Sequence, residues 1–164
     1  MSDTRAWIGL GSNLDDPCCH VARALEELDR LPLTRRLAAS TCYVSRPIGP
    51  ADQPDFVNAV AMIATRLSPL ALLDQLQALE QHHGRVRRRH WGPRTLDLDL
   101  LLFANYQLTL PRLILPHPEI AKRAFVLLPL AEIAPGLRLP DGRSVSWLAA
   151  SMGDHGVSPM LPDA

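Results

Sequence analysis

Two aspartates, Asp97 and Asp99, directly follow an arginine-rich segment, and together these residues carry the clearest chemical signal in the chain. Five arginines lie between Arg85 and Arg94. Successive side chains of a β-strand point to opposite faces, so both carboxylates would project from one face, about 7 Å apart. The leucines that alternate with them would take the other face.

Neighbouring carboxylates repel each other, so this pair predicts a cation between them. Hard oxygen donors suit Mg²⁺, which typically binds through one or two carboxylates and completes its shell with water and substrate phosphates. Guanidinium groups bind phosphate oxygens bidentately, and the arginines would supply that contact. The alternative is an amphipathic edge strand whose aspartates face solvent, but aspartate is depleted in strands. The stretch therefore predicts a metal and nucleotide-phosphate site.

The composition favours one globular domain over a general nucleic-acid binder. The chain has 164 residues, of which 47% are hydrophobic and 21% are charged. It carries 17 basic and 17 acidic residues, so its formal net charge is zero, whereas a nucleic-acid binder needs a basic excess. Positive charge is instead concentrated in one short segment, which favours a compact phosphate site. We expect a single domain over residues 1–164 that acts as a monomer.

The cysteines and the amino-terminal residues indicate a cytoplasmic protein. Cys18, Cys19 and Cys42 lack the spacing of metal ligands, and adjacent cysteines make a poor disulfide, so we expect reduced, mostly buried thiols. The first residues contain no apolar run typical of a signal peptide. No stretch approaches the roughly 18 consecutive apolar residues of a membrane span, so we expect no membrane association.

Alternating strand and helix patterns surround the aspartates and must position them. Asp16-Pro17 and Ser68-Pro69 each combine an N-cap residue with proline at the first helical position, and Gly84 is placed to end the second helix. Apolar periodicity predicts strands over residues 6–10, 36–44, 56–65 and 95–103 and helices over residues 17–31 and 69–80. The order β-α-β-β-α-β is that of a ferredoxin-like α+β fold, an antiparallel sheet with helices packed on it.

The rest of the chain would add to this core at its carboxyl-terminal end. An irregular, proline-rich crossing leads to His117, and helices follow over residues 125–133 and 145–151. Residues 158–164 would form a frayed tail. The segments 46–54 and 85–91 are predicted to be loops that close over bound substrates.

The run from Gly92 to Phe103, which contains Asp97-Leu98-Asp99, resembles the signature of the 6-hydroxymethyl-7,8-dihydropterin pyrophosphokinases of folate biosynthesis. The resemblance extends from residues 11–14 through the loop at 49–58 to residues 140–142, and so covers nearly the whole chain. It implies a ferredoxin-like α+β fold. It also implies transfer of pyrophosphate from MgATP to the 6-hydroxymethyl group of the dihydropterin, with release of AMP.

The residue chemistry agrees with the reaction that the resemblance implies. Attack on the β-phosphorus requires a neutralised triphosphate, which two Mg²⁺ ions on Asp97 and Asp99 would provide. Asp99 is also a candidate acceptor for the hydroxymethyl proton, although a carboxylate on two metals is a weak base. The arginines would bind phosphate oxygens and stabilise charge in the transition state. The candidates are Arg85, Arg87, Arg88 and Arg94, with catalytic roles for Arg85 and Arg94.

The dihydropterin is a flat polar heterocycle, so its pocket needs aromatic faces and an amide. Phe56 and Phe125 would sandwich the ring, and Asn58 would bind its donor–acceptor edge. On the residues alone, the phenylalanines would more often be core residues, and Asn58 could equally cap a turn or a strand, so the resemblance decides these roles. It implies further substrate contacts from Ser45, Pro47, Ile48 and Trp91.

The resemblance implies nucleotide contacts beyond the arginine segment. These are Gln77, Trp91, Leu100, Arg112, His117 and Arg123. On the residues alone, Gln77 could equally lie on a solvated helix face and His117 on the surface. Adjacent His82 and His83 diverge in direction and are not expected to form a metal pair. Residues 12–13 lack the lysine and the spacing of a phosphate loop, and we interpret them as a turn that supports the pterin pocket.

Two functions of other classes remain as alternatives. A ferredoxin-like RNA-binding module would use the arginine segment, but such modules usually need exposed aromatic residues on the sheet and a positive net charge. A metal-dependent phosphohydrolase would use the same carboxylates, but the sequence shows no further acidic cluster to hold the attacking water. The sequence favours the pyrophosphokinase.

Overall fold

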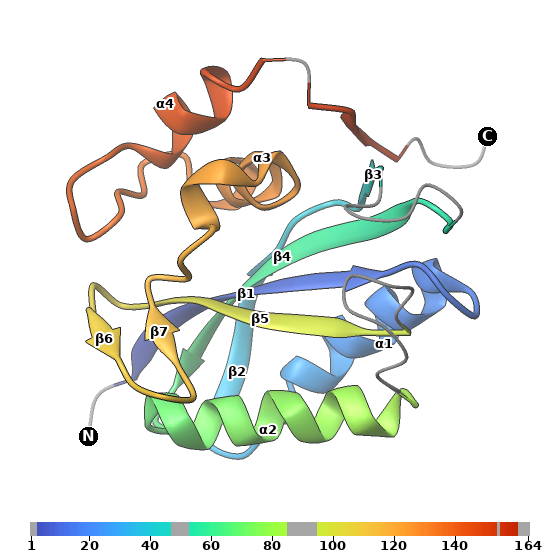
Figure 1. Cartoon of the computed structure of the whole chain (residues 1–164). Coiled ribbons are helices and arrows are strands. Elements are labelled where there is room, and N and C mark those ends of the chain that lie inside the picture. Colours follow the sequence, from blue (N-terminus) through green and yellow to red (C-terminus); the bar gives the residue numbers. More distant parts are fainter. Residues whose placement is uncertain (1–2, 47–52, 85–94, 154, 161–164) are drawn as a thin grey trace.

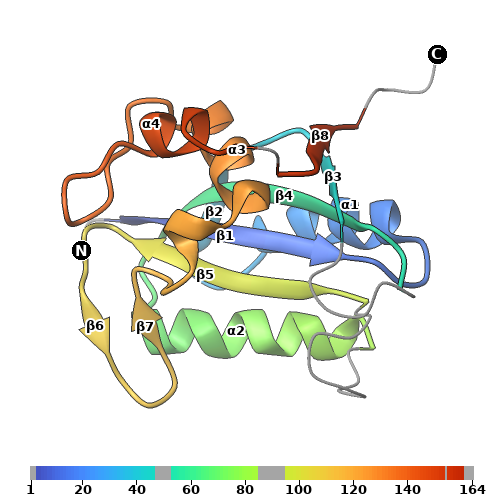
Figure 2. The same ribbon diagram turned by 45° about the horizontal axis from the view of Figure 1, so that its top comes forward.

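An antiparallel sheet with helices on both of its faces forms the protein (Figure 1). The structure is a computed structural model that describes residues 3–46, 53–84, 95–153 and 155–160. One face of the sheet carries α1 and α2, and the other carries α3 and α4 (Figures 1 and 2). The helices are α1 (Pro17–Leu28), α2 (Pro69–His82), α3 (Ala124–Ile133) and α4 (Val145–Ala150), with a 3₁₀ turn at Ile120–Lys122.

The sheet has the strand order β5-β1-β4-β3-β8, and β2 also pairs with β4. Its strands are β1 (Thr4–Ser12), β2 (Thr34–Ala39), β3 (Tyr43–Ser45), β4 (Phe56–Thr65), β5 (Asp97–Phe103) and β8 (Val157–Pro159). Every one of these pairings is antiparallel. The order β5-β1-β4-β2 combined with a β-α-β-β-α-β sequence is the ferredoxin-like arrangement, so the predicted α+β fold is confirmed.

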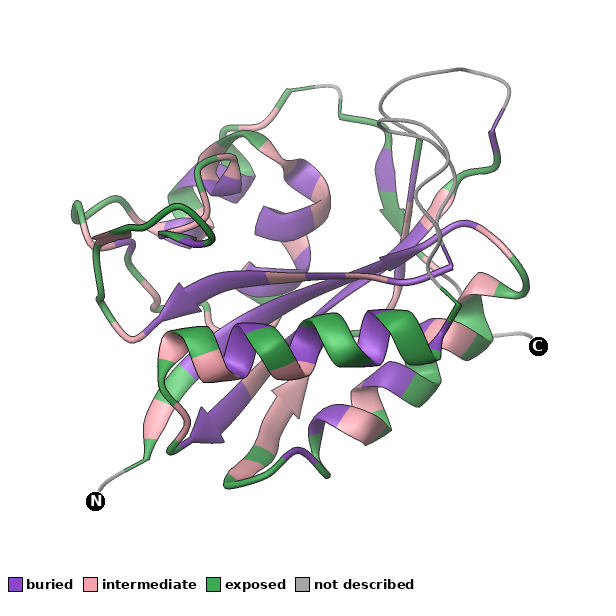
Figure 3. Ribbon diagram, turned by 60° about the horizontal axis from the view of Figure 1, so that its bottom comes forward, coloured by how far each residue is buried: buried purple, intermediate pink, exposed green. Residues whose placement is uncertain are grey.

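Two apolar layers hold the helices to the sheet. The layer under α1 and α2 includes Val21, Leu76 and Leu98, and the layer under α3 and α4 includes Leu101 and Leu127. Figure 3 shows that α1 and α2 turn buried residues toward the sheet and exposed residues outward. Helix residues three and four apart share a face, so the apolar spacing of the sequence produces these one-sided helices.

A register shift in β5 changes which face its side chains occupy. Leu100 pairs with Ile8 and Leu102 pairs with Trp7, so Leu101 is an additional residue between them. Leu98 and Leu100 therefore belong to the layer under α1 and α2, whereas both Leu101 and Leu102 pack in the layer under α3. Such a bulge re-aims the side chains around it. The aspartates lie before the bulge, on the α3 face.

The helix boundaries largely follow the predicted capping residues. The Ser68 hydroxyl accepts a hydrogen bond from the Ala71 amide, as expected for an N-cap, and Gly84 has a φ of 75° just beyond α2. Asp16 holds the N-cap position of α1, but its φ is 64° and its side chain makes no capping hydrogen bond. Proline at the first helical position, Pro17, is thus the signal that correctly located this helix.

The predicted strand over residues 36–44 is wrong in its continuity, because β2 ends at Ala39 and β3 begins at Tyr43. Ser40 lies in the gap, and its hydroxyl accepts from the Val60 amide and donates to the Thr41 carbonyl. Serine hydroxyls compete with backbone pairing in this way. The chain consequently shifts from β2 to β3 along the same edge of β4.

Three smaller predictions are also corrected. The crossing before His117 contains a two-stranded hairpin, β6 (Leu108–Thr109) and β7 (Ile114–Leu115). The expected frayed tail over 158–164 is wrong for Ser158 and Pro159, because β8 pairs with β3. Cys18 and Cys19 are exposed, although mostly buried thiols were expected.

Some predictions concern residues that the structure does not describe. Most of the loop 46–54 and all of the loop 85–91 lie outside the described residues, as do residues 161–164. Across the described ranges, none of the helices is both long and apolar enough to pass through a membrane.

Candidate active site

Asp97 and Asp99 lie on β5, the edge strand of the sheet, and both are half-buried. Asp97 is paired with Gly11 and Asp99 with Gly9 on β1. Leu98 between them and Leu100 directly after Asp99 are buried against α1 and α2. Successive residues of a strand point to opposite faces, so the aspartates point to the α3 face, as predicted from the sequence. The paired residues Gly9 and Gly11 share that face.

A row of paired residues runs across the sheet from the first aspartate. Gly11 pairs with Asp97 on one side and with Asn58 on the other, and Asn58 pairs in turn with Tyr43. Gly11 has no side chain, so the row contains a gap between the carboxylate and the amide. A Cβ at Gly11 would lie 3.3 Å from Asn58 Oδ1 and 3.7 Å from a ring carbon of Phe56. The glycine therefore creates space on the sheet beside both polar groups.

Asn58 is oriented by a hydrogen bond inside the sheet. Its Nδ2 donates to the Ser45 hydroxyl at 2.6 Å, and Asn58 and Ser45 are 3% and 4% exposed. A buried amide with a fixed orientation presents defined donors and acceptors. The structure thus brings together two of the predicted substrate residues. Phe56, which pairs with Ser45, lies on the same face.

Arg123 connects the carboxylates to the beginning of α3. Its Nη1 lies 3.7 Å from Asp99 Oδ2, and its guanidinium carbon lies 5.5 Å from the centre of the Phe125 ring. Both charged side chains are partly exposed, at 26% for Arg123 and 33% for Asp99. A guanidinium held by an aromatic face and a carboxylate is suited to bind a phosphate. Arg123 was predicted to contact the nucleotide and Phe125 to contact the pterin, and their side chains are neighbours.

His117 is fixed beside the same strand as a neutral imidazole. Its amide donates to the Leu101 carbonyl at 2.9 Å, and its Nδ1 accepts from the Glu119 amide at 3.1 Å. Burial and the Arg123 guanidinium lower the pKa of His117, while Glu119 and Asp97 oppose that effect. An accepting Nδ1 leaves the proton on Nε2, so His117 offers an N–H donor without a charge.

The other predicted nucleotide residues lie toward α2. Arg112 Nη2 donates to Gln77 Oε1 at 3.1 Å and contacts Asp74 Oδ1 at 2.6 Å, so the structure brings Gln77 and Arg112 together. Leu100 is 3% exposed and packs in the layer under α1 and α2. These residues and the aspartates therefore occupy opposite sides of β5.

Two contacts that the sequence did not reveal hold the aspartate strand in place. Glu80, 4% exposed near the end of α2, accepts a hydrogen bond from the Leu98 amide at 2.8 Å, between the two aspartates. The Ser12 hydroxyl donates to the Thr95 carbonyl. Ser12 was interpreted only as part of a turn. A polar residue on a predicted helix gives no sign that it is buried, so no local signal pointed to Glu80.

A third contact that the sequence did not reveal holds β3 against α3. The Glu132 carboxylate accepts from the Thr41 amide and hydroxyl at 2.9 and 2.8 Å and from the Tyr43 hydroxyl at 2.7 Å. Burial, this hydrogen bond and the charge of Glu132 raise the pKa of Tyr43 to about 12. The contact therefore anchors the beginning of β3, the strand that also carries Ser45.

Seven predicted site residues lie outside the described part of the chain. They are Pro47, Ile48, Arg85, Arg87, Arg88, Trp91 and Arg94. Their roles stay predictions.

The two aspartates fit Mg²⁺ by donor type and by the space beside them. Both are hard oxygen donors on one face, and Gly11 leaves room next to Asp97. Within the described ranges, no group of three or more histidine, cysteine, aspartate or glutamate side chains is arranged to hold a metal. A cation at the pair would therefore take further ligands from water and substrate, as Mg²⁺ commonly does.

Comparison with known proteins agrees with this arrangement. A sequence model of the family described as 7,8-dihydro-6-hydroxymethylpterin-pyrophosphokinase matches residues 7–135. The chain belongs to this family. It is 54% identical over 160 residues to a 2-amino-4-hydroxy-6-hydroxymethyldihydropteridine pyrophosphokinase of Pseudomonas aeruginosa, covering 98% of each chain. Its identity to the same-named protein of Haemophilus influenzae is 47%, over 96% of this chain and 98% of the relative.

Solved structures show the same fold. The chain superposes on a crystal structure of an HPPK-DHPS in complex with substrates with a TM-score of 0.74 at 14% identity, over 92% of this chain and 43% of that one. A Plasmodium falciparum HPPK-DHPS with pteroate gives a TM-score of 0.71 at 13% identity, and the chain spans 42% of its length. The resemblance inferred from the sequence is thus confirmed: the protein is a pyrophosphokinase enzyme of folate biosynthesis that transfers pyrophosphate to hydroxymethyldihydropterin.

Proposed function

We propose that this chain transfers the pyrophosphoryl group of MgATP to the hydroxymethyl oxygen of 6-hydroxymethyl-7,8-dihydropterin on the α3 face of the sheet, releasing AMP. The observation that carries the proposal is the row formed by Asp97, Gly11 and Asn58. It sets a carboxylate and a fixed amide on the same face, with a residue without a side chain between them. The carboxylate suits a metal-bound phosphate, and the amide suits a polar heterocycle.

The pterin is proposed to bind over Gly11 with its polar edge on Asn58. The Asn58 amide is held by Ser45, so it binds the ring without first having to become ordered. Phe56 and Phe125 would contact the two faces of the ring. Pro47, Ile48 and Trp91 complete this proposed pocket.

The nucleotide is proposed to cross β5, with its triphosphate beside the aspartates. Arg123 and the neutral His117 would donate hydrogen bonds to phosphate oxygens. Arg85, Arg87, Arg88 and Arg94 would add further cationic contacts. Gln77, Leu100, Trp91 and Arg112 are the proposed contacts for the rest of the nucleotide. Arg112 would exchange its present contacts with Asp74 and Gln77 for the ligand.

Asp97 and Asp99 are the proposed ligands of two Mg²⁺ ions, which when bound would neutralise the triphosphate and polarise the β-phosphoryl group. The protein would contribute position and charge. In the proposed step the hydroxymethyl oxygen forms a bond to the β-phosphorus and loses its proton, for which Asp99 is the candidate acceptor. The bond from that phosphorus to the oxygen bridging the α- and β-phosphates breaks, and AMP leaves with the electron pair. Arg85 and Arg94 would stabilise the charge that develops on the leaving oxygens.

Incubation of the purified protein with ATP, Mg²⁺ and hydroxymethyldihydropterin tests the proposal. AMP and the pyrophosphorylated pterin should form in equal amounts, and no AMP should form without pterin. Release of free phosphate without pterin would point to a phosphohydrolase instead. Retention of RNA by the purified protein, without turnover of ATP, would point to an RNA-binding module.

We also propose that the active unit is a monomer in the cytoplasm. Sedimentation in the presence of substrates measures the mass of the active species, and a dimer under turnover conditions would contradict the proposal.

A further inference from the structure

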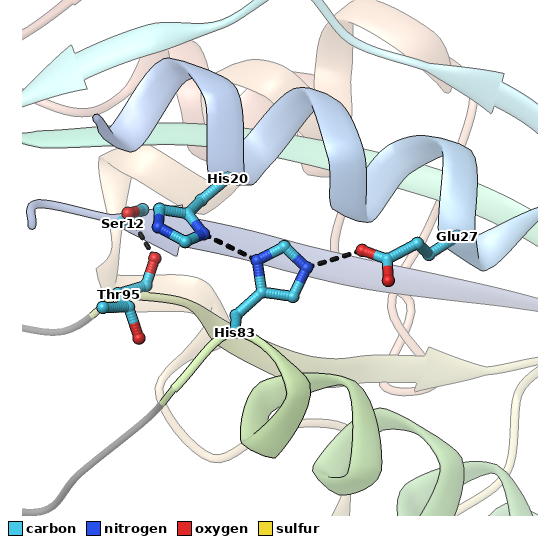
Figure 4. A network of polar contacts seen from close by, with 5 residues as sticks. All are labelled: Ser12, His20, Glu27, His83 and Thr95. Carbon is cyan, nitrogen blue, oxygen red and sulfur yellow. Dashed lines mark hydrogen bonds and ion pairs between the residues drawn. The ribbon is translucent and has the colours of Figure 1, made fainter. Parts of the chain in front are cut away.

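Three side chains, those of His20, Glu27 and His83, join α1 to the carboxyl-terminal end of α2 (Figure 4). The Nδ1 atoms of His20 and His83 are 2.6 Å apart, and His83 Nε2 lies 2.5 Å from Glu27 Oε1. The side chain of His83 is 0% exposed and that of Glu27 is 28% exposed. We call the three residues the clamp.

The clamp can carry one additional proton but not two. In its neutral form, His83 donates from Nε2 to Glu27 and accepts at Nδ1 from His20. One added proton on either ring still leaves one donor and one acceptor between the two Nδ1 atoms. If both rings are cationic, two N–H groups oppose each other at 2.6 Å. The contact must then open.

The charges around the pair also favour its less protonated forms. Burial, His83 and Arg23 lower the pKa of His20, while Asp15 opposes that effect. Arg23 and Glu27 face the pair from α1, Asp15 faces it from the turn before α1, and α2 contributes His83 itself. Folding lowers the pKa of His20 below its ordinary value. The neutral ring therefore stabilises the folded state at pH values above the ordinary pKa, and this stabilisation is lost as the pH falls below that value.

The clamp lies one helical turn from a contact with the aspartate strand. The His83 amide donates to the Leu79 and Glu80 carbonyls at 3.1 and 3.2 Å, so His83 closes the last turn of α2. The Glu80 carboxylate in that turn accepts from the Leu98 amide at 2.8 Å. Leu98 lies between Asp97 and Asp99. A continuous series of described contacts therefore runs from the clamp to the residues proposed to hold the metals.

We propose that His20 and His83, together with Glu27, are positioning residues for the aspartate pair, and that double protonation of the two histidines releases this support. The inference rests on the proposed roles of Asp97 and Asp99. It assigns the acid sensitivity of MgATP binding to two histidines that have no part in the proposed function. Pterin binding, proposed at Asn58 on β4, should not share that sensitivity.

A glutamine at position 20 separates proton uptake from the contact itself. Its amide can donate to neutral His83 or, after rotation, accept from cationic His83, so His20→Gln keeps the clamp closed in both states. His82→Gln is the matched control, because His82 is an exposed neighbour of His83 whose replacement also removes one titratable ring. Thermal unfolding at each pH shows which variants are folded.

The binding of MgATP without pterin is measured by calorimetry between neutral and acidic pH for the wild type and both variants. Once both histidines are protonated, the MgATP affinity of the wild type and of His82→Gln should fall by about tenfold per pH unit more than that of His20→Gln. The KM for pterin should follow the same pH dependence in all three proteins. Parallel MgATP curves for the wild type and His20→Gln would overturn the inference.

Nitrogen NMR of the imidazole rings tests the clamp independently of catalysis. We expect the contact between the rings to be lost in the wild type when both rings are cationic, and the contact of His83 with residue 20 to persist in His20→Gln. Two cationic rings that remain in contact would refute the mechanism. Failure to form AMP at any pH, with these titrations intact, would refute the proposed function and leave the clamp supported.

Discussion

Replacement of Gly11 by alanine should weaken pterin binding while leaving the fold intact. The new Cβ would lie 3.3 Å from Asn58 Oδ1, closer than ordinary contact, so the amide would have to move by a few tenths of an ångström. Asn58 is also held by its 2.6 Å hydrogen bond to Ser45, so it cannot move without straining that bond. A weakened hydrogen bond to the ring costs about 1 kcal/mol, or roughly fivefold in affinity.

The expected result of Gly11→Ala is therefore a roughly fivefold rise in the KM for pterin, with little change in the KM for ATP. Steady-state AMP formation at varied pterin measures it. Gly9→Ala is the matched control, because a Cβ there would lie 3.5 Å from Leu101 side-chain carbons, an ordinary contact. Its unfolding free energy should change by no more than about 0.5 kcal/mol.

A double-mutant cycle shows whether the methyl group acts through the amide. If it does, adding Gly11→Ala to Asn58→Ala should raise the KM for pterin no further than Asn58→Ala alone. Full additivity of the two changes would show that the methyl group acts on the pterin directly and not through the amide, whereas an unchanged KM in a folded Gly11→Ala variant would refute the proposed pocket over Gly11.

Two further predictions concern the contacts that support the site. The Tyr106→Phe variant leaves Tyr43 as the remaining tyrosine, so its tyrosinate absorbance should rise only near pH 12. Adding Glu132→Gln should lower the midpoint of that rise, because it removes a charged acceptor. An unchanged midpoint would contradict the contact between Tyr43 and Glu132. Glu80→Gln keeps an acceptor for the Leu98 amide, whereas Glu80→Ala removes it. The alanine variant should therefore have an unfolding free energy about 1–3 kcal/mol lower than the glutamine variant. It should also bind MgATP more weakly. Equal denaturant midpoints and equal MgATP affinity for the two variants would argue against this hydrogen bond.

Local signals in the sequence predicted most of the sheet and helices. β4 has its predicted bounds, Phe56–Thr65, because apolar residues dominate it and turn residues flank it. α2 is bounded by Ser68 and Gly84, whose conformations are specific to helix ends. The interruption at Ser40 was missed because its hydroxyl binds Val60, which lies twenty residues away. The pairing of β8 with β3 joins segments still farther apart, and no local pattern encodes it.

The candidate site divides in the same way. Asp97 and Asp99 were accessible to sequence reasoning because two carboxylates with strand spacing are unusual in themselves. Asn58 required the resemblance, since its partner Ser45 and its neighbour Gly11 come from other strands. Glu80 was missed because a glutamate near a helix end is normally solvated, and its burial depends on β5.

The clamp illustrates the same limit for histidines. His82 and His83 are adjacent in the sequence, yet the first is exposed and the second is fully enclosed by α1. The sequence predicted that the two side chains diverge in direction, and their different burial agrees with that prediction. It could not show that His83 pairs with His20 and Glu27, because those residues are brought near only by the packing of two helices.

Turnover by single aspartate variants tests the central claim most directly. Asp97→Asn and Asp99→Asn are compared with Asp141→Asn, which removes an equal charge from an exposed side chain paired with Arg143. Each β5 variant should lower kcat for AMP formation by at least about a hundredfold. Thermal unfolding of Asp97→Asn should be unchanged or raised, because repulsion between the carboxylates is relieved. That of Asp99→Asn should change little, because the same relief is offset by loss of the partly exposed ion pair with Arg123. Asp141→Asn should match the wild type. Near-wild-type turnover by both β5 variants would contradict the assignment of the active site to this face of the sheet.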